Sequence, residues 1–175
     1  MAVSGITETT QHLTFVLDDE IFALDISKVR EVLDYTKITN VPRTPDFMRG
    51  VINLRGSVVP VVDMRLKLGM SITEHSVDTC IIIVEINLDN EVTVLGALVD
   101  SVQEVFDLEP DQIEPAPKIG ARLRTEFING MGKRDGGFII ILDIDKVFSY
   151  DELVLAQETD KNIPVEKAKE PAAAV

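Results

Sequence analysis

The stretch that decides the fold is PRTPDFMRGVINLRGSVVPVVDMRLKL, residues Pro42 to Leu68. Two runs rich in β-branched residues, 51–54 and 58–62, flank the turn at Arg55-Gly56. Valine and isoleucine on both sides of a glycine-containing turn favour two paired strands, with the arginine carried outward on the turn. We expect Pro60 to face an unpaired edge or a bulge, because proline cannot donate to a strand ladder.

The same stretch is basic although the protein is acidic. It contains five basic and two acidic residues, a local charge of +3, whereas the whole chain has 17 basic and 30 acidic residues and a net charge of −13. A basic, arginine-bearing hairpin in such a protein indicates a docking surface. The acid excess argues against nucleic acid and anionic membranes as partners, since both are bound through clustered cations.

Length and composition predict a β-rich globular protein of the cytoplasm. With 175 residues, 45% of them apolar, the chain is long enough to bury a core. The single cysteine, Cys80, excludes an internal disulfide and fits a reducing compartment. No uncharged run approaches the roughly 18 residues of a membrane helix, and the first residues show no secretion signal. We expect no insertion into a membrane.

Short strands and turn signals recur along the chain. Three more hairpins are expected, at 13–16 with 21–25, 79–86 with 91–99, and 127–131 with 137–142. About eight to ten short strands without long helices between them favour barrels or a sandwich. Two short helices are also expected. Apolar residues at helical spacing between Ile26 and Leu33 predict a helix or turn, and a capping-box pattern at Ser149–Glu152 predicts a C-terminal helix.

No residue pattern predicts catalysis, a metal or a cofactor. His12 and His75 are distant in sequence and, with one cysteine, supply too few ligands for a zinc or iron site. Both histidines are interpreted as solvated surface residues, and Cys80, at the head of an apolar strand, as a packed thiol. The glycines between 130 and 136 miss the spacing of a phosphate-binding loop. We therefore expect a protein that is not an enzyme.

The stretch at 42–65 also resembles the CheW family, small adaptors that couple bacterial chemoreceptors to the histidine kinase CheA. The matching pattern is PxxPxFxRGVINLRGxVVPVVDxR, and the resemblance continues at 22–32, 96–102, 112–117 and 125–132. It covers residues 12 to 156, nearly the whole chain.

The resemblance implies an all-β fold of two intertwined five-stranded SH3-like barrels that share a hydrophobic core, with a groove between them. The domain would span 12–157, with one barrel built mainly from about 20–75 and the other mainly from 79–142. Residues 1–11 and 158–175 lack an apolar face, so we expect both ends to be disordered.

The resemblance further implies partner-binding roles for six residues: Arg55, Gly50, Glu31, Val29, Val99 and Val102. Arg55 matches the family's Asn-Leu-Arg-Gly arginine, associated with kinase and receptor coupling; from the residues alone it could equally be an ordinary turn arginine. The surface at Gly50 would also face a partner. Val29, packed inward, and Glu31, exposed, would lie near a groove for the receptor's helical hairpin tip. Val99 and Val102 are the matching groove candidates from the second half of the chain. From spacing alone, plain core positions for these two valines are at least as well supported as groove positions.

The favoured interpretation is a non-catalytic adaptor that bridges chemoreceptor tips and a CheA-type kinase, which has a CheW-like regulatory domain of its own. Two alternatives stay open. One is a CheW-like scaffold of another receptor–kinase system, such as surface motility. The other is a small-ligand-binding β-barrel, which the absence of tryptophan and of clustered histidines disfavours.

Overall fold

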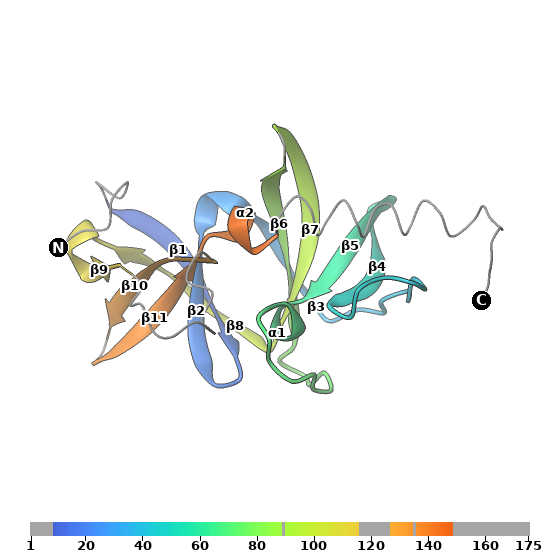
Figure 1. The fold of residues 1–175 in the computed structure, drawn as a ribbon, viewed down its shortest axis with the longest axis horizontal. Helices are drawn as coiled ribbons and strands as arrows, with labels where there is room; N and C mark the ends of the chain where they lie inside the picture. The colour runs from blue at the N-terminus through green and yellow to red at the C-terminus, as the bar shows by residue number, and fades with distance from the viewer. Residues whose placement is uncertain (1–8, 89, 116–126, 135, 149–175) are drawn as a thin grey trace.

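The chain folds into two β-sheets that lie side by side (Figure 1). The computed structural model describes residues 9–88, 90–115, 127–134 and 136–148. The strands of this part of the chain are β1 (Thr10–Leu17), β2 (Glu20–Asp25), β3 (Val29–Asp34), β4 (Met48–Leu54), β5 (Ser57–Asp63), β6 (Cys80–Leu88), β7 (Glu91–Val99), β8 (Ser101–Leu108), β9 (Ile113–Glu114), β10 (Ile128–Arg134) and β11 (Gly137–Leu142). The short helices are η1 (Ile26–Lys28), α1 (Met64–Lys67), η2 (Pro110–Gln112) and α2 (Ile144–Val147).

All four expected hairpins are confirmed as antiparallel pairs: β1–β2, β4–β5, β6–β7 and β10–β11. The β4–β5 turn places Arg55 and Gly56 at φ values of 51° and 89°. The Asn53 side chain stabilises it by accepting a 2.8 Å hydrogen bond from the Gly56 N–H. Pro60 pairs with Val51 of β4, and the pairing of β5 with β7 runs from Val61 to Asp63, so the proline lies just before that ladder. Strand β5 is internal to its sheet, so the expected unpaired edge at Pro60 is not found.

Local structure differs from the expectation at one segment, and one strand was not predicted. The helical spacing between Ile26 and Leu33 produces only the three-residue η1, and the chain then continues as β3, an edge strand paired with β6. Strand β8 was not expected and forms an edge of the other sheet. The expectation of a disordered start at 1–11 is wrong for Thr10 and Gln11, which belong to β1. Residues 1–8, the expected disordered tail at 158–175 and the helix predicted from Ser149–Glu152 lie outside the described residues.

The two sheets exchange hairpins. The six-stranded sheet, sheet A, has the order β8-β1-β2-β11-β10-β9, and the five-stranded sheet, sheet B, has the order β3-β6-β7-β5-β4. The β1–β2 hairpin thus joins the C-terminal strands through the parallel pair β2–β11. The β6–β7 hairpin joins the strands before it through the parallel pair β5–β7. The two halves are therefore intertwined. The sheets do not follow the expected division into residues 20–75 and 79–142, because β6 and β7 lie in the same sheet as β3, β4 and β5.

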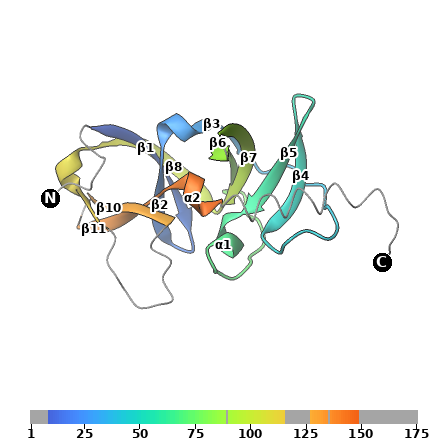
Figure 2. The same ribbon diagram turned by 45° about the horizontal axis from the view of Figure 1, so that its top comes forward.

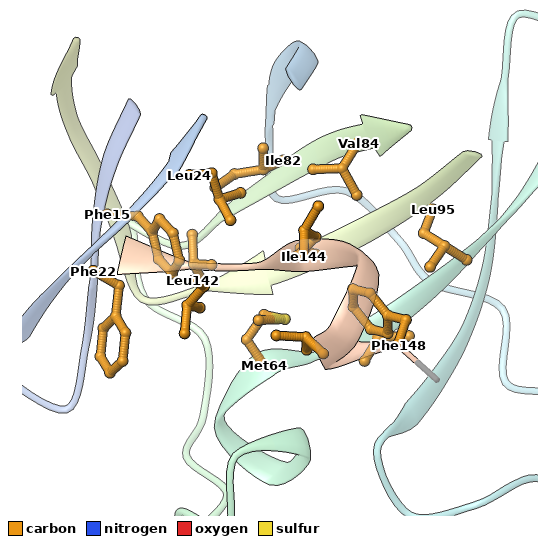
Figure 3. Packing of buried hydrophobic residues seen from close by; sticks show 14 of the residues in the cluster. Phe15, Phe22, Leu24, Met64, Ile82, Val84, Leu95, Leu142, Ile144 and Phe148 are labelled. Carbon is orange, nitrogen blue, oxygen red and sulfur yellow. The ribbon is translucent and has the colours of Figure 1, made fainter. Parts of the chain in front are cut away.

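A hydrophobic core lies between the sheets and is shared by them. Figure 3 shows side chains from sheet A, from sheet B and from the helix α2 meeting there, for example Phe15, Ile82 and Ile144. Helices α1 and α2 lie between the sheets in both views (Figure 2). Each sheet packs its other face on a second, smaller cluster.

Strand β6 explains how the clusters are connected. Ile82 and Val84 point into the shared core, whereas Ile81 and Ile83 point into the second cluster of sheet B, and all four are fully buried. Strand β6 is therefore covered on both faces. Full burial of such a side chain contributes about 1.5–3 kcal/mol, so β6 fixes the position of one sheet against the other.

Candidate partner-binding surface

The β4–β5 turn holds Arg55 in an ion pair with Glu31 of β3. The Arg55 Nη1 and Nη2 atoms donate hydrogen bonds of 2.7 and 2.8 Å to the two carboxylate oxygens of Glu31. Strand β3 is one edge of sheet B and β4 is the other, so this pair connects the two edges of one curled sheet. Two residues that the sequence nominated separately are therefore brought together.

The pair combines defined geometry with exposure. The Arg55 side chain is 71% exposed and that of Glu31 28% exposed. The hydrogen bond from Arg55 lowers the pKa of Glu31, and Glu31 raises the pKa of Arg55, so both groups carry their charge at neutral pH. A planar guanidinium held by a bidentate carboxylate keeps its outer edge and face available to a protein partner.

Gly50 has a structural role beneath this surface. Its φ is +141°, and a Cβ atom there would lie 2.0 Å from the carbonyl oxygen of Thr39. Thr39 pairs with Val51 and covers β4 at this point. Gly50 is buried and lies at a register shift between β4 and β5, so only glycine fits the backbone conformation and the close approach.

The three valines differ in exposure. Val29 and Val102 are partly buried, and both pack against the shared core. Val99 is only 1% exposed and belongs to that core, so the alternative of a plain core position describes it. Val29 and Val102 lie on one edge strand of each sheet, β3 and β8, at the margin of the core.

Most of the basic charge of the 42–68 stretch is already paired. Arg49 forms a 3.0 Å ion pair with the buried Asp63. Arg65 contacts Asp100 at 2.5 Å and Asp18 at 3.5 Å, and its side chain is only 13% exposed. The expected basic docking surface is therefore narrower than the charge count indicated, and Arg55 is its most exposed paired arginine.

Two charged contacts that sequence reasoning missed join the sheets on either side of the shared core. Asp100 links β7 of sheet B to β8 of sheet A; its carboxylate accepts from the Asp18 N–H and from Arg65 of α1. Asp145 of α2 pairs with Lys28 at 2.9 Å and accepts from a backbone N–H of β6. No sequence signal could have found them, because each partner is more than 30 positions away.

The candidate reactive groups have ordinary surroundings, with one exception. His75 is exposed, as expected, and stacks on Tyr35 with ring centroids 3.9 Å apart. The expectation for His12 is wrong: its side chain is 2% exposed within β1, and burial lowers its pKa. Burial raises the pKa of Cys80, which disfavours the thiolate. Within the described residues no group of His, Cys, Asp or Glu is arranged to hold a metal ion.

In the described ranges, no helix has both the length and the hydropathy of a membrane span.

Comparison with known proteins places this geometry in a family. The sequence model of the CheW-like domain matches residues 11–152. The chain is 34% identical to the chemotaxis protein CheW of Klebsiella aerogenes, over 91% of this chain and 94% of that protein. It is 33% identical to chemotaxis protein CheW of Rhizobium meliloti, over 83% and 97%.

A solved structure gives the same result. The crystal structure of the scaffolding protein CheW from Thermoanaerobacter tengcongensis superposes with a TM-score of 0.72 at 36% identity, over 82% of this chain and 94% of that chain. This confirms the resemblance inferred from the sequence, and with it a fold of two SH3-like subdomains. The chain belongs to the CheW family of non-catalytic chemotaxis adaptor proteins.

Proposed function

We propose that this protein couples chemoreceptors to a CheA-type histidine kinase in bacterial chemotaxis. Its partners are the helical hairpin tip of a receptor's cytoplasmic part and the CheW-like regulatory domain of the kinase. It acts in the cytoplasm, at the inner face of the membrane where receptor tips are found, without inserting into the membrane and without binding nucleic acid.

The observation that carries this proposal is the Glu31–Arg55 pair, on a chain that belongs to the CheW family. Both residues were nominated as partner-binding from the sequence, and they meet in a bidentate, exposed ion pair. Arginine is enriched among residues that dominate protein interfaces, since its fork of donors and its flat apolar faces suit desolvated contacts. An orientation fixed in advance lowers the entropy cost of binding.

The receptor tip requires a different surface. An amphipathic helix docks through apolar side chains, and rim charges set its register. Val29 and Val102 supply partly buried apolar surface on the edge strands of the two sheets, each at the margin of the shared core. Val99 is buried and belongs to the same core cluster, so it is not part of the accessible surface.

The mechanism is linkage. An adaptor that binds the receptor and the kinase at once holds them at a high effective concentration. If the receptor's two conformations bind the adaptor with different affinities, that difference biases the kinase equilibrium by the same free energy. This requires a rigid connection between the two surfaces, and the shared core together with the Asp100 and Asp145 contacts supplies one.

The test is a pull-down with three purified components: this protein, a CheA-type kinase and a receptor cytoplasmic fragment. We expect the kinase and the receptor fragment to be retained together only when this protein is present. Retention of neither would refute the proposal. Retention of a kinase and receptor from a surface-motility system, but not of the chemotaxis pair, would favour the alternative CheW-like scaffold.

A further inference from the structure

The chain contains one structural unit twice. Every Cα partner pair of the β4–β5 hairpin recurs 80 positions later in the β10–β11 hairpin. The register shift next to Gly50 recurs next to Gly130. The aspartates that end the hairpins, Asp63 and Asp143, each donate a backbone N–H to the phenylalanine carbonyl just before their own hairpin. Each aspartate also caps the helix that follows.

The edge strands repeat as well. Strand β3 in sheet B and strand β8 in sheet A both pair on one side only, and both contain a register irregularity against their neighbour. The exposed fractions of their outward valines are similar, 40% for Val32 and 45% for Val105. Three residues of β3 recur 73 positions later in β8 in the same order: Val29, Glu31 and Val32 correspond to Val102, Glu104 and Val105.

This correspondence extends to the ion pair. Glu104, the counterpart of Glu31, accepts a 2.9 Å hydrogen bond from Nη2 of Arg134 at the end of β10. The position 80 residues after Arg55 is Asp135, so the arginine of the second unit is displaced by one position, yet it reaches the matching glutamate. The Arg134 guanidinium also lies over the Phe106 ring, 4.2 Å from its centroid, a favourable cation–π geometry.

We infer that Glu104 and Arg134 are positioning residues: they hold β8, and Val102 on it, as Glu31 and Arg55 hold β3 and Val29. The physical reason is that an edge strand has a ladder on one side only and opens more easily than a central strand. A side-chain pair from the hairpin across the sheet supplies a second attachment. The consequence for receptor binding rests on the proposed function.

The test of the pair itself is a double-mutant cycle read by hydrogen exchange of the β8 amides. Glu104→Gln removes the pair and should make these amides exchange about two- to fivefold faster, the range for an exposed ion pair. Adding Glu104→Gln to Arg134→Met should have no further effect, because the cycle cancels the lost ring contact. The control is Asp107→Asn, which removes the same charge from an exposed position of the same strand. Exchange no faster than in this control would overturn the inference.

The positioning role is tested by the affinity of each variant for a receptor cytoplasmic fragment, measured by titration calorimetry. Glu104→Gln and Glu31→Gln should both weaken binding, and Asp107→Asn should not. Faster exchange with unchanged affinity would overturn the positioning role and leave the pair a feature of the fold. Failure of the unmodified protein to bind the fragment would refute the proposed function, while the exchange experiment would still decide whether the pair exists.

Discussion

Replacing Arg55 with alanine should separate binding from folding. The Arg55 side chain is 71% exposed and contributes no atoms to any of the three hydrophobic clusters. What the fold loses is one exposed ion pair with Glu31, and such pairs contribute little to stability because solvent screens them. We expect the melting midpoint to fall by less than about 4 °C for a chain of this size.

Binding should respond much more strongly. An arginine anchored in an interface typically weakens binding by about thirtyfold or more when it is truncated to alanine. The assay is titration calorimetry with the regulatory domain of a CheA-type kinase, combined with thermal unfolding of the free variant. Lys133→Ala is the control, since this half-exposed lysine forms an ion pair with Glu114 in the other sheet.

Glu31→Gln distinguishes a direct contact from an indirect one. If Arg55 touches the kinase domain, Glu31→Gln should weaken binding less than Arg55→Ala, because the guanidinium is still present. Equal losses in both variants would mean that the pair acts only by holding β3. Unchanged kinase affinity in Arg55→Ala would refute the placement of the docking surface, and an unfolded Arg55→Ala would show that the residue is structural.

Three further predictions concern the fold. Gly50→Ala should destabilise the protein by at least about 2 kcal/mol in urea unfolding, because its φ is +141° and its Cβ would collide with a backbone oxygen; Gly56→Ala, with open space around it, should cost less. Thr14→Val should cost about 1–3 kcal/mol, since the Thr14 hydroxyl both donates to and accepts from one backbone residue of β8, whereas Thr14→Ser should retain both bonds. Burial lowers the pKa of His12 in the folded state, so the unfolded chain binds this proton more readily and the free energy of unfolding should fall as the pH drops below about 6.5; His12→Gln should reduce that dependence, and an unchanged slope between pH 7.5 and 5.5 would contradict it.

Local pattern was sufficient for the hairpins and insufficient for the edge strands. Each hairpin combines β-branched runs with a turn that tolerates positive φ, as at Asp19 and Asn90. Strand β8 carries Gln103, Glu104 and Asp107 on exposed positions, so it lacks the apolar alternation by which a strand is recognised. The exchange of hairpins between sheets could not be predicted either, because local sequence does not specify which strand is the partner.

The same limit applies to the site. The sequence nominated Arg55 and Glu31 individually, but the two residues are 24 positions apart in the chain and their pairing depends on the curl of the sheet. Val99 and Val102 show that spacing near a strand end does not distinguish a core position from a surface margin. The sequence predicts a surface position for His12, because its burial depends on the pairing of β1 with β8 and local sequence does not predict β8.

We propose that this protein makes kinase output depend on the receptor. The direct measurement is phosphoryl transfer within a CheA-type kinase, followed with radiolabelled ATP, in mixtures of kinase, receptor fragment and this protein. We predict that the receptor fragment changes the kinase rate only when this protein is present, and that Arg55→Ala abolishes most of that change. A kinase that responds equally to the receptor without this protein, or that never responds with it, would refute the coupling role.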